Sequence, residues 1–314
     1  MEDRPDLVVI AGPTGVGKTA VAVALAARVP LEVISADSRQ VYRGMDAATG
    51  KPTAAERAAA PHHLIDVVDP DDRYQAARFR ADAEALVGAI RARGRLPVVV
   101  GGTGLYIRAL LRGLDPAPAA DPGFRRELAA VAAREGGAAL HARLVGQAPE
   151  LARRLHPNDR VRVVRALERA RAGDAALAAQ TRWTADEGPY AVAYFGLTLE
   201  RAALARRLRA RAAAFVAAGL AAEVARLLAR GYDPGLPALG SLGYREFVEV
   251  AQGRLEPAEA LRRMQRDTVR YAKRQWTWFR REPGVTWIEV EAAGGPAGAA
   301  RRIEAELRER GVLR

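Results

Sequence analysis

Residues 12–19 carry the chain's clearest chemical signal, because they fit the phosphate-binding pattern G-x-x-x-x-G-K-[ST]. An apolar run at 7–11 precedes them and a helix-favouring run at 20–28 follows, so the pattern stands between a strand and a helix. Glycines let backbone N–H groups wrap round an anion, Lys18 reaches the outer phosphates, and Thr19 can hold Mg²⁺. We expect a phosphorylated ligand here, whether or not it is ATP. The predicted ligand-binding residues are Gly12, Pro13, Thr14, Gly15, Val16, Gly17, Lys18 and Thr19.

Two more candidates follow two other apolar runs. Asp37 comes directly after the run at 31–36, where it can accept a proton from a bound nucleophile or cap the next helix. Thr103 follows the run at 96–100 and two glycines, which suits contact with a phosphate oxygen or a tight turn into a helix. An ATPase usually has a Mg²⁺-binding aspartate after a later strand, and this run leads into glycines instead.

Basic residues form two further patterns. Arg207 and Arg211 are spaced i, i+4 on a predicted helix, so both can converge on a diphosphate or remain exposed charges. The predicted helix at 262–281 has a basic face with aromatic residues interleaved, which favours binding to a nucleic-acid backbone over a merely solvated face. Lysines occur only at positions 18, 51 and 273, so each of these three positions draws attention.

The order of elements predicts an α/β fold. Continuous apolar runs at 7–11, 31–36, 96–100, 191–199 and 285–290 alternate with helix-favouring stretches, which indicates a parallel sheet with helices on both faces. A Pro/Ala-rich segment at 115–122 and an acidic, Gly/Pro-containing segment near 186–189 bound an arginine-rich helical block. We expect a catalytic core at 1–114 and 190–314 and an inserted helical subdomain at 115–189. Ligands of such sheets bind beyond the carboxyl ends of the strands.

Composition narrows the class of protein. The formal net charge is +12, and the basic excess lies in 153–182, 200–235 and 236–281, whereas 1–115 is nearly balanced. This distribution fits a small-ligand site beside a polyanion-binding surface, or an arginine-rich solvated surface. The chain has no cysteine, so thiol catalysis and cysteine-ligated metals are excluded. No apolar run approaches the ~20 residues of a membrane span, and we expect a cytoplasmic protein with no membrane contact.

Seven motifs in order, covering nearly the whole chain, resemble the tRNA dimethylallyltransferase (isopentenyltransferase) family. One departure is Ala-Thr-Gly-Lys-Pro at 48–52, where the family more often has Gly-Thr-Ala-Lys-Pro. The motifs are Gly-Pro-Thr-x-x-Gly-Lys-Thr (12–19), Ser-Ala-Asp-Ser-Arg-Gln-Val-Tyr-Arg-Gly-Met-Asp (35–46), Pro-His-His-Leu-Ile-Asp (61–66), Val-Gly-Gly-Thr-Gly-Leu-Tyr (100–106), His-Pro-Asn-Asp (156–159), Gly-Tyr-Arg-Glu (243–246) and Lys-Arg-Gln-x-Thr-Trp-Phe-Arg (273–280).

The resemblance implies a P-loop NTPase-like fold and transfer of a dimethylallyl group from dimethylallyl diphosphate to the exocyclic amine of the adenine just 3′ of the anticodon. Asp37 is then the general base, and Thr103 contacts the bridging oxygen of the diphosphate. Lys18, Thr19 with Mg²⁺, and Arg207 or Arg211 stabilise the departing pyrophosphate. The base is flipped into the pocket, and a monomer is expected.

The resemblance also implies contacts with the anticodon stem-loop. Three other kinds of protein also fit parts of this sequence: a small-molecule kinase that binds ATP, a relative that prenylates free adenine nucleotides, and an RNA-binding protein that uses the loop as a nucleotide switch. The implied tRNA-binding residues are Asp37, Ser38, Arg39, Gln40, Thr103, Arg125, Val161, Arg162, Val163, Val164, Arg165, Gly243, Tyr244, Arg245, Lys273, Arg274, Gln275 and Arg280.

Overall fold

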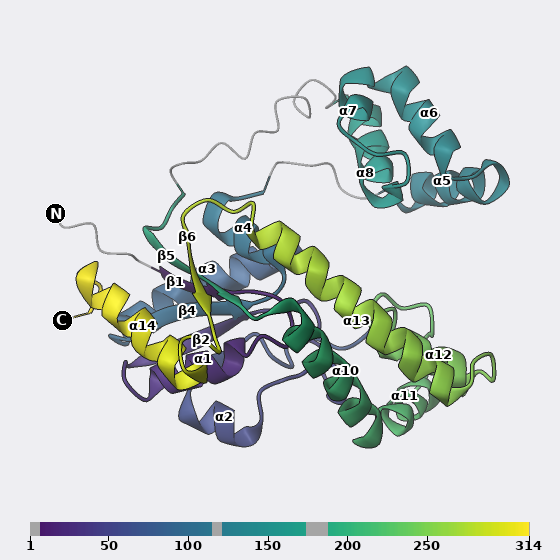
Figure 1. The fold of residues 1–314 in the computed structure, drawn as a ribbon. Coiled ribbons are helices and arrows are strands. Elements are labelled where there is room, and N and C mark those ends of the chain that lie inside the picture. The colour runs from purple at the N-terminus through teal and green to yellow at the C-terminus, as the bar shows by residue number, and fades with distance from the viewer. Residues whose placement is uncertain (1–6, 115–120, 174–187, 314) are drawn as a thin grey trace. The chain divides into compact units, whose positions relative to one another are not determined.

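The computed structural model describes residues 7–114, 121–173 and 188–313, shown as a ribbon in Figure 1. The chain forms two compact units. One comprises Met1–Gly113 and Gly188–Arg314, and the other comprises Leu114–Glu187. We call them the core unit and the helical unit.

The core unit is built on a sheet of six parallel strands in the order β3-β2-β4-β1-β5-β6. The predicted α/β fold with a parallel sheet is therefore confirmed, and five strands lie at the five predicted apolar runs. The sixth, β3, pairs with β2 and was not predicted. The strands are β1 (Leu7–Ala11), β2 (Leu31–Ala36), β3 (His62–His63), β4 (Leu96–Gly101), β5 (Val192–Thr198) and β6 (Val285–Glu289).

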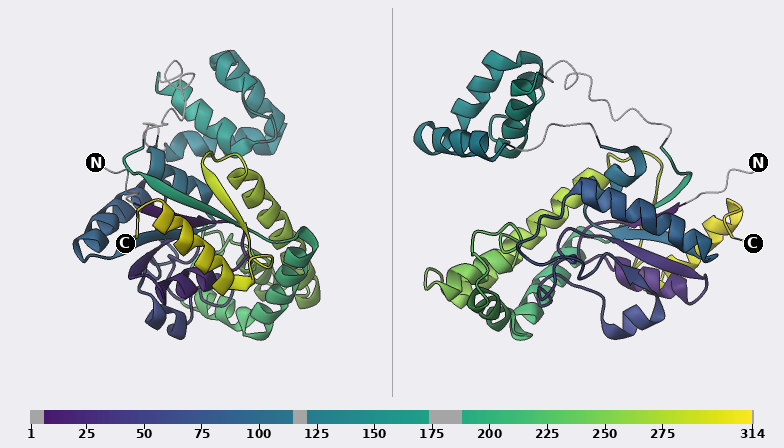
Figure 2. Two further views of the ribbon diagram at one scale, coloured as in Figure 1. Left: turned by 60° about the vertical axis from the view of Figure 1, so that its left-hand side comes forward. Right: turned by 180° about the vertical axis from the view of Figure 1, so that it is seen from behind.

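Burial on both faces explains the continuous apolar runs. All five residues of β1 are fully buried. Val8 and Ile10 pack into one cluster with residues of α1 (Lys18–Ala26) and α14 (Gly295–Glu309), while the alternate residue Val9 faces the other side of the sheet. Figure 2 shows α1 and α14 on one side of the sheet and α3 (Ala76–Ala92) on the other. Phe79 of α3 stacks on Tyr106 of α4 (Gly104–Arg112).

Four helices gather beyond one end of the sheet in Figure 1. They are α10 (Arg201–Ala217), α11 (Leu220–Ala229), α12 (Tyr244–Ala251) and α13 (Pro257–Phe279). Helix α10 packs on α13, and α12 packs on both α11 and α13. The buried residues of α13 recur at helical spacing and include one polar side chain, Gln275. Among the described helices none is by itself long and apolar enough to cross a membrane, and only the bent pair α10–α11 reaches that length and composition when taken together.

The helical unit has a core of its own. It contains α5 (Pro122–Glu135), α6 (Gly137–Gln147), α7 (Pro149–Arg153) and α8 (Arg160–Arg171). Phe124, Leu128, Leu144 and Leu167 are among the buried side chains that pack together there. Asp121 caps α5 and Asp159 caps α8 by accepting hydrogen bonds from backbone N–H groups.

Candidate functional site

Three loops meet at the carboxyl ends of neighbouring strands. Gly101 of β4 lies opposite both Ala11 of β1 and Ala36 of β2, so the segments that follow these strands start side by side. The Thr103 backbone N–H donates to the carbonyl of Ala36 at 3.1 Å, which joins the β4 loop to the β2 loop. This is the edge of a parallel sheet at which ligands bind.

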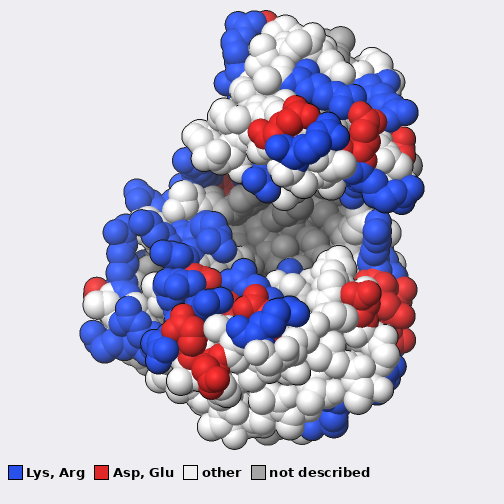
Figure 3. Space-filling model, turned by 90° about the vertical axis from the view of Figure 1, so that its right-hand side faces the viewer, with Lys and Arg blue, Asp and Glu red and all other residues white. Residues whose placement is uncertain are grey.

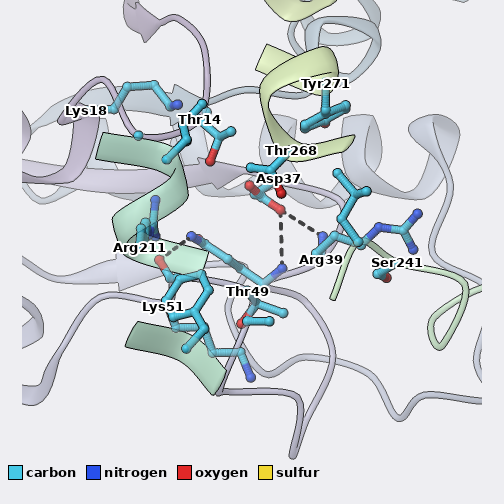
Figure 4. A pocket seen from close by; sticks show the side chains of 18 of the residues that line it. Thr14, Lys18, Asp37, Arg39, Thr49, Lys51, Arg211, Ser241, Thr268 and Tyr271 are labelled. Atoms are coloured by element: carbon cyan, nitrogen blue, oxygen red, sulfur yellow. Dashed lines mark hydrogen bonds between the residues drawn. The ribbon is translucent and has the colours of Figure 1, made fainter. Parts of the chain in front are cut away.

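A cavity of about 820 Å³ opens at this edge. The phosphate loop, the Asp37 turn, the loop at 48–52 and helices α10 and α13 all contribute to its wall, and Figure 4 shows it from close by. In this view Lys18 and Arg211 lie to one side of Asp37, and Tyr271 and Arg39 lie to the other. Candidate residues from the phosphate loop, Lys18 and Thr19, and from α10, Arg207 and Arg211, therefore share one cavity with Asp37.

Lys18 is held by the phosphate loop itself. Its ammonium group donates to the carbonyls of Gly12 (2.9 Å) and Pro13 (3.0 Å). Burial lowers the pKa of Lys18 to about 8; the negative charge of Asp37 opposes this shift, and the positive charge of Arg211 adds to it. A cation that has lost part of its hydration is well suited to receive a phosphate.

Arg211 lies deeper in the cavity than Arg207. Its guanidinium group lies over the ring of Phe215, 4.9 Å from the centroid, and is only half exposed, whereas Arg207 is exposed. Burial lowers the pKa of Arg211, Asp37 opposes this shift, and Arg207 adds to it. Two cations four residues apart on α10 thus line the same cavity as Lys18, which makes this side of the cavity strongly attractive to anions.

Asp37 fixes the turn that follows β2, and no helix begins there for it to cap. One carboxylate oxygen, Oδ1, accepts hydrogen bonds from the backbone N–H groups of Arg39 (2.8 Å) and Gln40 (3.3 Å). These bonds fix the turn after β2 and orient the carboxylate, while the side chain still lines the cavity. The turn is therefore built so that a carboxylate is held beside the phosphate loop.

Thr103 stands at the start of α4 and is tied to the Asp37 turn. Its hydroxyl accepts a hydrogen bond from the Ser38 backbone N–H at 3.1 Å. Gln40 in the same turn accepts a hydrogen bond from the Ser35 hydroxyl and donates one to the Gly50 carbonyl. The loop at 48–52 is thus anchored to the Asp37 turn, and Gly50 adopts a left-handed conformation there (φ +64°).

Lys51 has a structural role in this loop. Its side chain is only 6% exposed, and its ammonium group pairs with Asp46 and Asp66 and donates to the Tyr42 carbonyl. Burial raises the pKa of Asp66, but hydrogen bonds from Lys51 and Arg57 outweigh it and hold that pKa below its usual value. A compact cation that contacts three acceptors at once explains why a lysine stands at this position.

Sequence reasoning did not select several residues of the cavity. Thr268 and Tyr271 face Asp37 from α13 in Figure 4, and Ser241 comes from the segment before α12. Burial and the charge of Asp37 raise the pKa of Tyr271 to about 12, so its phenol stays protonated. Their spacing in the sequence could have indicated them. Met264, Thr268, Tyr271 and Gln275 recur at intervals of three or four residues, which places them on one face of α13.

The predicted tRNA-binding residues of the core unit differ in exposure. Lys273, Arg274 and Arg280 are exposed on or next to α13, and Arg280 lies over the ring of Trp276. Arg39 donates to the Pro237 carbonyl, and exposed Arg245 pairs with Glu246 and Asp267. Gly243, Tyr244 and Gln275 are buried, and Tyr244 donates to the carboxylate of Glu223.

In the helical unit the predicted positions form part of α8 and α5. Val161 and Arg162 are exposed on α8, Val164 is half-buried, and Val163 is fully buried in the unit's core. Arg125 and Arg165 both pair with the buried carboxylate of Glu168, and these bonds lower the pKa of Glu168 despite its burial. These contacts fix α5 against α8.

Comparison with known proteins gives a consistent result. The chain matches the family model described as IPP transferase over residues 40–282 and that described as isopentenyl transferase over residues 5–65. A tRNA dimethylallyltransferase of Anaeromyxobacter dehalogenans (strain 2CP-C) is 51% identical over 298 residues, which is 95% of this chain and 99% of that protein. One from Geobacter sulfurreducens is 46% identical, with 92% of this chain and 93% of that protein covered.

Solved structures agree. The full-length tRNA isopentenylpyrophosphate transferase of Bacillus halodurans superposes with a TM-score of 0.72 at 38% identity, covering 99% of this chain and 98% of that one. The tRNA delta(2)-isopentenylpyrophosphate transferase of Staphylococcus epidermidis gives a TM-score of 0.71 at 31% identity, with 97% and 99% of the two chains covered.

Proposed function

The chain belongs to the IPP transferase family, that of the tRNA dimethylallyltransferases, and we propose that it transfers the dimethylallyl group of dimethylallyl diphosphate to the exocyclic amine of the adenine 3′-adjacent to the anticodon of tRNA. The new bond joins the amine nitrogen to C1 of the dimethylallyl group. The bond between C1 and the bridging oxygen breaks, pyrophosphate leaves, and the amine proton passes to a base.

One observation carries this proposal: Lys18, Asp37 and Arg211 line the same cavity. The two cations suit a diphosphate, and the carboxylate is the group that can remove a proton from a poor nucleophile whose lone pair is delocalised into the adenine ring. In the transition state negative charge moves onto the leaving pyrophosphate, so cations placed around it lower the barrier. Arg207 extends the same cationic wall.

Asp37 acts as the general base in this proposal. Its Oδ1 is held by the N–H groups of Arg39 and Gln40, so the carboxylate is oriented before the substrate arrives. Thr103, held by its bond to Ser38, contacts the bridging oxygen of the diphosphate and supports the charge that develops there. Tyr271, protonated and adjacent to Asp37, forms part of the wall against which the flipped adenine rests.

Mg²⁺ fits this cavity as a partner of the diphosphate. Thr19, at the start of α1, supplies a hydroxyl ligand, and no group of three or more acidic or histidine side chains suited to a metal occurs in the described residues. Mg²⁺ usually keeps several waters and is shared with substrate phosphates, so a site with one protein hydroxyl is consistent with its chemistry. Bound there, Mg²⁺ would neutralise charge on the leaving group.

The RNA surface in this proposal consists of the exposed basic residues around α13. The end of the core unit that carries α12 and α13 faces the viewer in Figure 3, where lysine and arginine side chains gather with acidic ones between them. Lys273, Arg274 and Arg280 contact phosphates of the anticodon stem-loop, and Ser38 and Arg39 lie at the cavity where the adenine enters. In the helical unit Arg162 and Val161 are the exposed predicted contacts.

Competing donors and acceptors test the proposal. The purified protein is incubated with Mg²⁺ and labelled dimethylallyl diphosphate, with either unmodified tRNA or AMP, and separately with ATP and the same acceptors. Label in tRNA alone supports the proposal. Label in AMP but not in tRNA contradicts it in favour of an adenylate prenyltransferase, and phosphate transfer from ATP contradicts it in favour of a kinase.

A further inference from the structure

Gln275 links two loops of the site through a single side chain. Its amide oxygen Oε1 accepts a hydrogen bond from the Thr14 backbone N–H in the phosphate loop at 2.8 Å. Its amide nitrogen Nε2 donates to the carbonyl of Gly102, next to Thr103, at 2.8 Å. The side chain is buried, so both bonds lie largely away from water. One residue of α13 therefore holds the loop that carries Lys18 and the loop that carries Thr103.

The packing around Gln275 is equally close. A Cβ atom at Gly102 would lie 2.3 Å from Gln275 Nε2, and one at Gly104 would lie 2.2 Å from Nε1 of Trp278. Gln275 and Trp278 are three residues apart and so share one face of α13. Helix α13 thus rests on the backbone on both sides of Thr103, and a Cβ atom at either glycine would displace the side chain of Gln275 or Trp278.

An amide is the side chain that can make both bonds. Thr14 N–H requires an acceptor, and the Gly102 carbonyl requires a donor, at the two ends of the same short span. A carboxylate accepts but cannot donate, and an aliphatic side chain does neither. Losing the donor leaves the buried Gly102 carbonyl unpaired, which costs more than the bond itself contributes, and losing the acceptor leaves the part-buried Thr14 N–H without this partner.

We propose that Gln275 is a positioning residue of the transferase reaction, which holds the phosphate loop and the Thr103 loop in fixed register so that both meet the same diphosphate. The inference rests on the proposed function and refines it. The family resemblance placed Gln275 among the residues that contact tRNA, whereas its burial between two loops favours action through Thr14 and Gly102. Its exposed neighbours Lys273 and Arg274 are on the helix face that is open to RNA.

Two substitutions of Gln275 distinguish a positioning role from direct contact with RNA. Gln275→Leu removes both bonds, and Gln275→Glu keeps the acceptor for Thr14 N–H while losing the donor, so it remains informative if the leucine variant does not fold. Gln265 is a matched control on the same helix, because its amide donates to the Arg209 carbonyl outside the two loops. Gln265→Leu and Gln265→Glu report the general effect of these changes on α13.

Five quantities are measured: kcat and KM for dimethylallyl diphosphate at saturating RNA, the Kd of an unmodified anticodon stem-loop by fluorescence anisotropy, the Kd of Mg²⁺–pyrophosphate by calorimetry, and the melting temperature. We expect Gln275→Leu to lower kcat/KM for dimethylallyl diphosphate roughly 10- to 100-fold and to weaken pyrophosphate binding, with RNA affinity within about twofold of wild type. Gln275→Glu is intermediate, and the Gln265 variants resemble wild type.

A double-mutant cycle tests the route of the effect. If Gln275 acts through the Thr103 loop, Gln275→Leu costs less in a Thr103→Ala background than in wild type. Full additivity, or weakened RNA binding with kcat/KM and pyrophosphate affinity unchanged, overturns the inference and returns Gln275 to the RNA contacts. If the wild-type protein transfers nothing to tRNA, the proposed function fails, while pyrophosphate binding still decides whether Gln275 holds the two loops.

Discussion

The backbone N–H of Ser38 donates a hydrogen bond to the hydroxyl of Thr103 at 3.1 Å. This bond joins the turn that carries Asp37 to the loop that follows β4, so the proposed base and the group proposed to contact the bridging oxygen are held in register. In the proposed reaction the proton acceptor lies beside the attacking amine and the leaving-group contact lies beside the bridging oxygen, so their spacing matters. A direct bond between their loops is a simple way to fix that spacing.

The Asp37→Asn variant separates the proposed role of Asp37 as a base from its role in fixing the turn. Asparagine Oδ1 still accepts from Arg39 and Gln40 N–H groups, so the turn and the melting temperature are expected to be retained. Without a proton acceptor, kcat falls by about 10²- to 10⁴-fold, while the Kd of the anticodon stem-loop stays within a few-fold. Asp37→Ala abolishes transfer and also loosens the turn. Near-normal turnover in the asparagine variant would remove Asp37 as the base.

Thr103→Ala and Thr103→Ser distinguish the hydroxyl from the methyl group. The serine variant keeps an acceptor for Ser38 N–H and a contact for the bridging oxygen, so its kcat is expected to be close to wild type. The alanine variant loses both, and we expect kcat to fall by roughly 10- to 100-fold because transition-state charge loses a partner. Steady-state kinetics at saturating RNA measure this difference. Equal loss in both variants would indicate a packing role.

The pKa of Lys18 predicts how diphosphate binding depends on pH. That pKa is lowered to about 8, chiefly by burial, so the ammonium group is charged below pH 8 and loses its charge as the pH rises through that value. The Kd of isopentyl diphosphate, a saturated analogue that cannot react, is expected to rise roughly tenfold between pH 7 and 9. Because Arg211 lowers the pKa of Lys18, Arg211→Met should move the change to higher pH. Binding that stays constant to pH 10 would contradict this assignment.

The buried pairing of Glu32 predicts that the protein loses stability in acid. It lies at the start of β2, only 4% exposed, where it accepts hydrogen bonds from Arg93 and pairs with His63. The bond from Arg93 lowers the pKa of Glu32 to about 2, burial opposes this, and His63 adds to it. Because the folded pKa lies below the usual value, the contribution to stability is complete above about pH 4.5 and is lost as the pH falls toward 2.

Denaturant unfolding checks this prediction. Glu32→Gln is expected to lower the free energy of unfolding at pH 7 by roughly 1–3 kcal/mol and to flatten its fall between pH 5 and 3. Glu84→Gln is the control, since Glu84 belongs to an exposed pair with Arg80 on α3 and such pairs contribute little. Equal effects of the two changes would show that the buried pairing of Glu32 contributes no more to the free energy of unfolding than the exposed pair does.

The proposed binding of RNA by α13 predicts that the affinity for RNA depends less on salt when a cation of this helix is removed. Lys273→Ala and Arg274→Ala each remove one exposed cation, and each is expected to weaken binding of the anticodon stem-loop and to reduce the slope of log Kd against log salt by about 0.7 to 1. Arg301→Ala on α14 serves as the control, because it removes an exposed cation from a different helix. An unchanged slope in the α13 variants would indicate that this face of the helix is solvated and does not contact RNA.

Much of the core fold could be predicted from the sequence because its strands are buried on both faces. A strand such as β1 must then be a continuous apolar run, which is visible without any tertiary information. The strand β3 has no such run: its two histidines are half-buried at the sheet edge, and His63 pairs with Glu32 of β2. Nothing local in that segment distinguishes it from a loop.

Part of the site could be predicted because its residues lie in the segments that follow strands. Lys18, Asp37 and Thr103 lie there, and parallel strands place their carboxyl ends together. Arg207 and Arg211 could be selected from their i, i+4 spacing on a predicted helix, and both line the cavity. Tyr271 and Gln275 come from a helix more than 230 residues beyond Asp37, and their place in the cavity depends on how α13 packs across the sheet edge. Nothing in the sequence of α13 shows that a buried polar amide, Gln275, meets the phosphate loop.

The most direct test of the account is to map the product on tRNA. Unmodified tRNA with adenine 3′ of the anticodon, and the same tRNA with guanine at that position, are incubated with the protein, Mg²⁺ and dimethylallyl diphosphate, then digested and analysed by mass spectrometry. We predict one dimethylallyl group, on the exocyclic amine of that adenine, and none in the guanine-substituted tRNA. Modification at another nucleoside, or equal modification of both tRNAs, would contradict it.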